Sequence, residues 1–259
     1  MTFDEYIDEA NSNFESNNLE YVIEISKKML IKNQLTKEQT LSVHYNKSRA
    51  YFELGELQQA LDNLNSVIQI DPSYANAYYN KARALLGLNK IQEALAQYDK
   101  AIELNNEYAG AYYNRSEIHF RLENYDLALD DMNKAIELYE NNPYAYCNRA
   151  SIYMEKENFI ESIADLTHAI HLEISEPLFY SQRAKAYYFI EDYQNAINDL
   201  DTVIAFDKTD SAAFYNRGMS KLKLQLQDEA LEDFQEALRL RPDDENLINT
   251  IDEINATTN

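Results

Sequence analysis

The stretch Ala77-Tyr78-Tyr79-Asn80-Lys81-Ala82 returns 34 residues later as Ala111-Tyr112-Tyr113-Asn114-Arg115-Ser116. Outward from this pair, the same order of small, aromatic and amide residues recurs through most of the chain, with no insertion or deletion between copies. The copies form six units, at residues 41–74, 75–108, 109–142, 143–176, 177–210 and 211–244. A fixed spacing of this length is the sequence signature of a repeat protein.

Each unit is predicted to be a helical hairpin. Counting from the first residue of a unit, apolar residues at positions 4, 8 and 11, and again from position 17 to position 28, follow the spacing of a helix rather than a strand. Two columns are small, which indicates two closely packed helices: Ser48, Ala82, Ser116, Ala150, Ala184 and Gly218 at position 8, and Ala60, Ala94, Ala128, Ser162, Ala196 and Ala230 at position 20. Gly55 or Asn89 mid-unit, and Pro72 near a unit end, mark helix ends.

The two small columns, a mostly aromatic column at position 4 of each unit and the proline near position 32 resemble the tetratricopeptide repeat (TPR) family. This resemblance implies an all-α, right-handed α-solenoid in which the first helix of each hairpin lines a concave groove. Residues 1–40 resemble a degenerate first hairpin, and residues 245–259 a C-terminal capping helix with a solvating face. The expected architecture is therefore about seven repeats and a cap.

Composition limits the classes of protein. The 259 residues carry a net charge of −22, which disfavours binding to nucleic acid or anionic lipid. No window is apolar enough for a membrane span, and the acidic start of the chain does not resemble a secretory signal. Cys147 is the single cysteine, so no internal disulfide is expected. These features predict a soluble, cytoplasmic, acidic protein without membrane insertion.

The charges separate between the two helices of each hairpin. Basic residues predominate in the first fourteen positions, and acidic residues strongly predominate in the rest. Every unit with Arg at position 7 has Asp at position 23, which predicts structural ion pairs within a hairpin. The pairs are Arg115 with Asp131, Arg149 with Asp165, Arg183 with Asp199, and Arg217 with Asp233. The alternative is that the position 7 column, with Lys47 and Lys81, forms a basic ladder for a partner.

An amide occupies position 6 of every unit: Asn46, Asn80, Asn114, Asn148, Gln182 and Asn216. A carboxamide both donates and accepts hydrogen bonds, so a row of amides suits the backbone of an extended peptide whatever its sequence. The row resembles the asparagine ladder in the repeats of O-linked N-acetylglucosamine transferase, although nothing in this sequence indicates glycosyl transfer. The alternative interpretation is that each amide braces the neighbouring repeat.

Aromatic and basic residues surround the amide row and complete the predicted peptide-binding site. They are Tyr45, Tyr79, Tyr113 and Tyr215 at position 5, with Arg49, Arg83 and Lys185 at position 9. Tyrosine and arginine are typical of binding hot spots. At Cys147 and Ser181 position 5 lacks its ring, so the predicted groove changes character midway.

The sequence predicts a scaffold or adaptor for protein binding, not an enzyme. Four scattered glycines cannot build a phosphate loop, and His168 with His171 lack further metal-ligand partners, so no cofactor or metal is expected. The expected partner is an extended protein segment of neutral-to-acidic character. Some proteins of the TPR family bind the C-terminal carboxylate of heat-shock chaperones with Lys, Arg and Asn side chains. That use is disfavoured here because Ile7 and Asn76 stand where the resemblance calls for cations. The alternatives are self-association into a homo-oligomer and, less favoured, small-ligand binding or catalysis.

Overall fold

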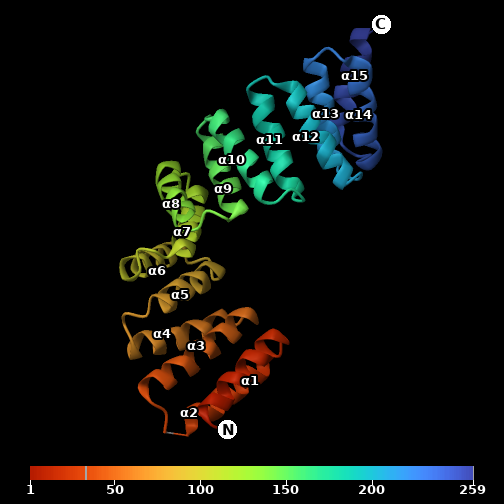
Figure 1. The fold of residues 1–259 in the computed structure, drawn as a ribbon. Coiled ribbons are helices and arrows are strands. Elements are labelled where there is room, and N and C mark those ends of the chain that lie inside the picture. Colours follow the sequence, from red (N-terminus) through yellow and green to blue (C-terminus); the bar gives the residue numbers. More distant parts are fainter. Residues whose placement is uncertain (33, 259) are drawn as a thin grey trace. The chain divides into compact units, whose positions relative to one another are not determined.

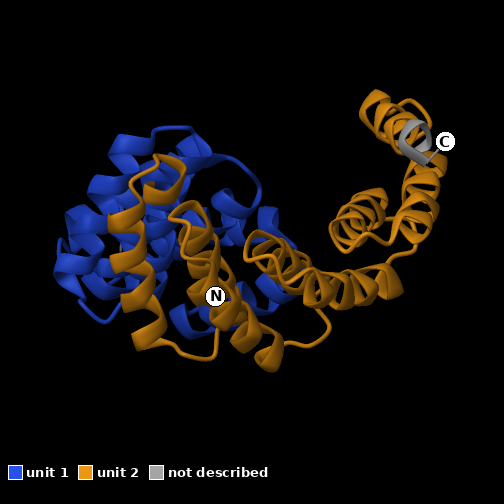
Figure 2. Cartoon of the chain, turned by 90° about the horizontal axis from the view of Figure 1, so that it is seen from above, with its two compact units in different colours: residues 1–118 blue, residues 119–259 orange. Residues whose placement is uncertain are grey.

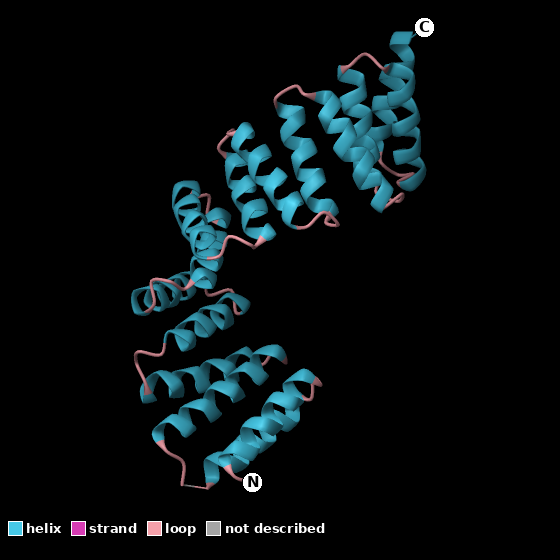
Figure 3. Cartoon of the chain, viewed as in Figure 1, coloured by secondary structure: helices cyan, strands magenta, loops and turns pink. Residues whose placement is uncertain are grey.

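A computed structural model describes residues 1–32 and 34–258, which form fifteen helices and no strand (Figure 3). By its internal contacts the chain divides into two compact units, residues 1–118 and 119–259, with the boundary inside α7 (Figure 2). The predicted all-α fold of repeated helical hairpins is confirmed. Within each unit, successive helices are antiparallel neighbours joined by short turns (Figure 1).

The helix bounds follow the sequence repeat. The first unit holds α1 (Phe3–Glu15), α2 (Leu19–Ile31), α3 (Lys37–Glu53), α4 (Leu57–Ile70), α5 (Ala75–Gly87), α6 (Ile91–Leu104) and most of α7 (Ala109–Arg121). The second holds α8 (Tyr125–Leu138), α9 (Pro143–Glu155), α10 (Phe159–Leu172), α11 (Pro177–Phe189), α12 (Tyr193–Phe206), α13 (Ser211–Lys223), α14 (Gln227–Leu240) and α15 (Glu245–Thr258). We call the odd-numbered helices α1 to α13 the first helices of their hairpins, and the even-numbered helices the second helices.

Side-chain caps and prolines set several helix starts. Thr2 and Glu5 form a capping box at α1, and Thr36 and Gln39 form another at α3. The second box explains why α3 begins at Lys37, ahead of the first regular repeat at residue 41. Helices α9 and α11 each begin with a proline, where the missing N–H has no intrahelical partner to lose.

The turn inside most hairpins passes through a left-handed residue just after the first helix. Gly55 adopts this conformation with φ of 76°, and Asn89 with φ of 59°. In later hairpins a glutamate or glutamine takes the same position: Glu123, Glu157, Glu191 and Gln225. A left-handed residue ends a helix and lets the chain reverse within a few residues, although it is strained for residues other than Gly or Asn.

The two small columns allow close helix contact. Ala60, Ala94, Ala196 and Ala230 are fully buried on the second helices. A Cβ atom at Gly218 would lie 2.9 Å from the Phe234 ring and 3.2 Å from the Ala230 carbonyl oxygen. Glycine is therefore required where α13 meets α14.

Both ends of the repeat array have a packed core. In the first hairpin Tyr6, Val22 and Ile25 are buried with Ala10 and Met29. At the other end Leu247 and Ile254 of α15 pack against the cluster around Phe234 on α14. No helix in the described ranges combines the length and apolar character that crossing a bilayer requires.

Candidate functional site

The structure divides the amide row into members with different environments. Asn46 is buried at 9% exposure, so a peptide backbone could not reach it. Asn80, Asn114, Asn148 and Gln182 are half-buried, and Asn216 is exposed. The amides are therefore not equally accessible, and the first position of the row lies outside any site for a visiting chain.

Two of the half-buried amides bind the tyrosine of the preceding repeat. Asn80 Nδ2 donates to the Tyr45 hydroxyl at 2.8 Å, and Asn114 Nδ2 donates to the Tyr79 hydroxyl at 3.1 Å. Both bonds join successive first helices, α3 to α5 and α5 to α7. In the first unit these amides thus brace neighbouring repeats, which is the alternative that the sequence left open.

The same bridge cannot form where position 5 lacks a phenol. Cys147 precedes Gln182 by one repeat, and Ser181 precedes Asn216. For the Asn216 side chain the structure has no hydrogen bond to any other residue it describes. Loss of the tyrosine therefore leaves the Asn216 amide available. Asn148 and Tyr113 are half-buried, and their role in binding stays a prediction.

Cys147 fills packing space rather than offering a reactive thiol. It is 4% exposed, and burial raises the pKa of its thiol to about 11. A thiol that stays protonated at neutral pH is a poor nucleophile.

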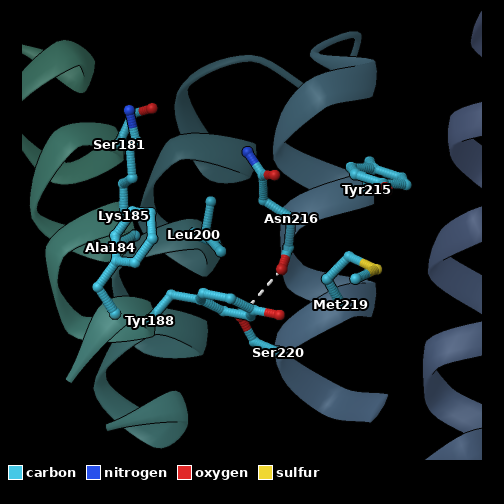
Figure 4. Close-up of a pocket in the computed structure, with 10 residues that line it drawn as sticks. Ser181, Ala184, Lys185, Tyr188, Leu200, Tyr215, Asn216, Met219 and Ser220 are labelled. Atoms are coloured by element: carbon cyan, nitrogen blue, oxygen red, sulfur yellow. Dashed lines mark hydrogen bonds between the residues drawn. The ribbon is translucent and has the colours of Figure 1, made fainter. Parts of the chain in front are cut away.

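A pocket of about 420 Å³ lies between α11 and α13, and we call it the α11–α13 pocket (Figure 4). Its lining combines apolar residues with a few polar ones: Ser181, Ala184, Lys185, Tyr188, Phe189, Leu200, Tyr215, Asn216, Met219 and Ser220. Figure 4 shows the Tyr188 ring reaching from α11 toward α13, below Asn216. Lys185 is exposed, so this pocket presents a cation and an amide beside apolar surface.

A second pocket, of about 220 Å³, lies in the first unit, and we call it the α3–α5 pocket. Its lining is more polar and is mostly from first helices: Tyr45, Ser48, Arg49, Phe52, Glu53, Leu64, Tyr79, Asn80, Arg83 and Tyr108. Tyr79 also stacks on Tyr108, with ring centroids 4.7 Å apart. Both pockets thus lie between successive first helices, each within one compact unit.

The arginines at position 7 bind carboxylates in two-pronged geometry. Arg149 donates from Nε and Nη2 to the two Asp165 oxygens at 2.8 and 2.7 Å, and these hydrogen bonds to Asp165 raise the pKa of the guanidinium. Arg183 binds Asp199 at the same two distances, and Arg217 binds Asp233 at 2.9 and 2.5 Å. Arg115 and Asp131 fall in different compact units, so the fourth pair stays a prediction.

Sequence reasoning missed the third contact of these arginines. Nη1 of each reaches position 25 of the preceding unit, on the preceding second helix. The acceptors are Asp99 for Arg115 at 2.6 Å, Asn133 for Arg149 at 2.9 Å, Thr167 for Arg183 at 3.1 Å and Asp201 for Arg217 at 2.6 Å. Asp, Asn and Thr can all accept a hydrogen bond, but they differ in charge and shape. The residues at position 25 therefore do not stand out in the sequence as a recurring partner of the arginines within this chain. These arginines donate to acceptors within the protein and are not free for a partner.

Lys47 and Lys81 replace arginine in the first two regular repeats, where Asn63 and Gln97 replace the aspartate. Both lysines are half-buried, and burial lowers the pKa of each ammonium group. Lysine has no planar fork, so neither Lys47 nor Lys81 can form the two-pronged pair seen at Arg149, Arg183 and Arg217.

Fold and pockets together define an α-helical repeat protein with pockets between its first helices. Models of the tetratricopeptide repeat family match residues 49–89, 79–143, 143–173 and 211–244, together more than half of the chain. The chain belongs to the tetratricopeptide repeat family. Proteins of this family bind protein or peptide partners, and their fold generally serves as a non-enzymatic interaction scaffold.

Solved structures share this fold at low sequence identity. YrrB, described as a TPR protein with an unusual peptide-binding site, is 24% identical with a TM-score of 0.67, covering 72% of this chain and 96% of that one. The C-terminal part of a TPR repeat-containing protein from Cytophaga hutchinsonii is 16% identical with a TM-score of 0.77, covering 93% and 97%. A tetratricopeptide repeat protein from Parabacteroides merdae is 21% identical with a TM-score of 0.66, covering 97% and 98%. No curated protein matches the sequence.

Proposed function

We propose that this protein is an interaction scaffold that binds an extended segment of a partner protein along the first helices of its hairpins. The observation that carries the proposal is the α11–α13 pocket, where the exposed Asn216 amide borders apolar surface. An unbonded amide at the rim of a pocket can pair with the N–H and C=O groups of a visiting backbone.

The lining of the pocket suits one bulky apolar side chain of the bound segment. Ala184, Leu200 and Met219 supply apolar surface, and Tyr188 supplies a ring. Aromatic rings contribute large contact area with little loss of side-chain freedom, which favours binding. The volume of about 420 Å³ exceeds that of a single side chain, so part of the neighbouring backbone enters as well.

The charge around the pocket favours a neutral-to-acidic segment. Lys185 is exposed at the rim, whereas the cations Arg183 and Arg217 on the same helices are bound to Asp199 and Asp233. Among the residues that line the pocket, Lys185 adds attraction for a carboxylate without making the pocket strongly basic. YrrB, with the similar fold, is described as having a peptide-binding site, which is consistent with this use of the fold.

Peptide selection tests this proposal. Peptides from a displayed random library would be selected on the wild-type protein and measured by calorimetry against variants. We expect Asn216→Ala and Lys185→Gln each to weaken binding about five- to tenfold, since each removes one or two hydrogen bonds or a charge-assisted contact. Both residues are exposed, so the fold should be unaffected.

Gln235→Ala is the matched control, because Gln235 is an exposed amide on α14, the second helix of the same hairpin. It should leave the affinity unchanged. The proposal fails if selected peptides bind Asn216→Ala and Lys185→Gln as tightly as the wild type, or if no peptide is selected above background.

A further inference from the structure

Two arginines in the first unit lie over aromatic rings in the same setting, one repeat apart. The Arg49 guanidinium carbon lies 4.4 Å from the Phe14 ring centroid, and that of Arg83 lies 4.4 Å from the Phe52 centroid. Each ring belongs to the preceding first helix. Stacking fixes the plane of a guanidinium while leaving its N–H edges free to donate.

Neither arginine has an acidic partner. Within residues 1–32 and 34–258, no carboxylate lies within 4.0 Å of either guanidinium, and the polar contact of Arg83 is the Asn80 Oδ1 at 3.4 Å. Helix α5 carries Lys81 and Arg83 and no acidic residue.

The α3–α5 pocket brings the two arginines to one place. Both line it, together with the hydroxyl-bearing Tyr45 and the Asn80 amide, and Glu53 is the acidic residue among its lining. Burial raises the Tyr45 pKa whereas Arg49 and Arg83 both lower it, so both cations act on the same phenol. Because the Tyr45 oxygen accepts from Asn80, its own hydrogen remains available to an incoming anion.

We propose that Arg49 and Arg83 form an anion site for side-chain carboxylates of an acidic partner segment, with two carboxylates spaced three residues apart. Neighbouring packed helices are about 8–10 Å apart. An extended chain in the polyproline II conformation rises about 3.1 Å per residue with three residues per turn, so every third side chain returns to the same face close to the next repeat. Each guanidinium then binds one carboxylate by its free edge.

This inference rests on the proposed function, because it assumes an extended segment on the first helices. It adds a partner class, and it uses residues that the α11–α13 pocket does not contain. Two stacked cations set one repeat apart suit two separate carboxylates better than one terminal carboxylate, so the site is assigned to internal acidic side chains.

A designed peptide tests the inference. The probe is a fluorescein-labelled, amidated peptide of Gly and Ser with Asp at every third position, measured by fluorescence anisotropy at low salt. We expect Arg49→Gln combined with Arg83→Gln to weaken binding about tenfold or more, since hydrogen bonds to charged groups are the stronger kind. The peptide with Asn in place of Asp, and one with the same number of Asp residues placed consecutively, should bind more weakly to the wild type.

Two double variants and one further peptide serve as controls. Lys90→Gln with Lys100→Gln removes the same charge from lysines of the first unit that pair with Glu93 and Glu103, and should change affinity less than twofold. Arg49→Lys with Arg83→Lys keeps the charge but loses the forked edge, so it should bind with intermediate affinity. A free C-terminus on the Asn peptide should not restore binding.

The inference is overturned if the arginine variants bind the Asp peptide like the wild type, or if the Asp and Asn peptides bind equally. Loss of binding with Asn216→Ala but not with the arginine variants would overturn this inference alone and leave the proposed function standing. If a free C-terminus restored binding of the Asn peptide, the α3–α5 pocket would instead be assigned to the terminal carboxylate of a partner chain.

Discussion

At the scale of single residues, Arg183 shows how one side chain connects three helices. It lies on α11, holds Asp199 of α12 with two hydrogen bonds, and reaches Thr167 of α10 with a third at 3.1 Å. Asp199 is 5% exposed. A partly buried guanidinium that donates from each of its three nitrogens acts as a fixed joint between successive hairpins.

Replacing Asp199 by Ala should lower the free energy of unfolding by about 3 kcal/mol, because it leaves the half-buried Arg183 without its carboxylate. Arg183→Met with Asp199→Leu should cost much less, since neither charge is then left unpaired. Urea unfolding followed by circular dichroism measures both. As control, Glu103→Ala breaks the exposed pair with Lys100 and should cost under about 0.5 kcal/mol. Equal losses at Asp199 and Glu103 would contradict the assignment.

Cys147 should react slowly in the native protein. Its folded pKa of about 11 exceeds the reference value of 9.0, because burial disfavours the thiolate. The contribution of the buried, protonated thiol to the free energy of unfolding is therefore fully present below pH 9 and is lost as the pH rises toward 11. At pH 8 a disulfide reagent should label the native thiol far more slowly than the thiol of the chain unfolded in urea. Equal labelling rates would show that the thiol is accessible.

At the scale of helices, the hairpin turns carry strain that glycine could relieve. Glu157 follows α9 with φ of 59°, the conformation that Gly55 adopts in the hairpin of α3 and α4. A side chain in the left-handed region costs about 1 kcal/mol relative to glycine. The cost is tolerated because each turn must reverse the chain within a few residues.

Glu157→Gly should therefore raise the free energy of unfolding by up to about 1 kcal/mol, despite the greater freedom of the unfolded chain. Glu155→Gly, two residues earlier at the last residue of α9, should instead lower it, by up to about 1 kcal/mol. Thermal unfolding of both variants beside the wild type measures the contrast. A stability loss at both positions would show that the turn is not strained.

At the scale of the whole molecule, arginines at two positions of the repeat have different roles. In the second unit Arg149, Arg183 and Arg217 are bound to aspartates. In the first unit Arg49 and Arg83 are stacked on rings without carboxylates. The acidic excess lies on the second helices, so an acidic partner is repelled from most of the surface and attracted where cations remain unpaired.

The repeat spacing, the helical hairpins and the small columns could be read from the sequence because they are periodic and local. The link between Arg at position 7 and Asp at position 23 is also visible there, since both partners lie within one repeat. Periodicity states which residues occupy equivalent places in successive hairpins. It does not state how closely those hairpins approach one another.

Contacts between repeats were therefore decided by the tertiary structure. The amide column looks uniform in the sequence, yet Asn46 is buried, Asn80 binds Tyr45 and Asn216 is exposed. The difference arises because the environment of each amide depends on the side chain one repeat earlier and on its distance, which only the stacking of hairpins determines. For the same reason the sequence predicted Arg83 as a binding residue but could not place it over the Phe52 ring.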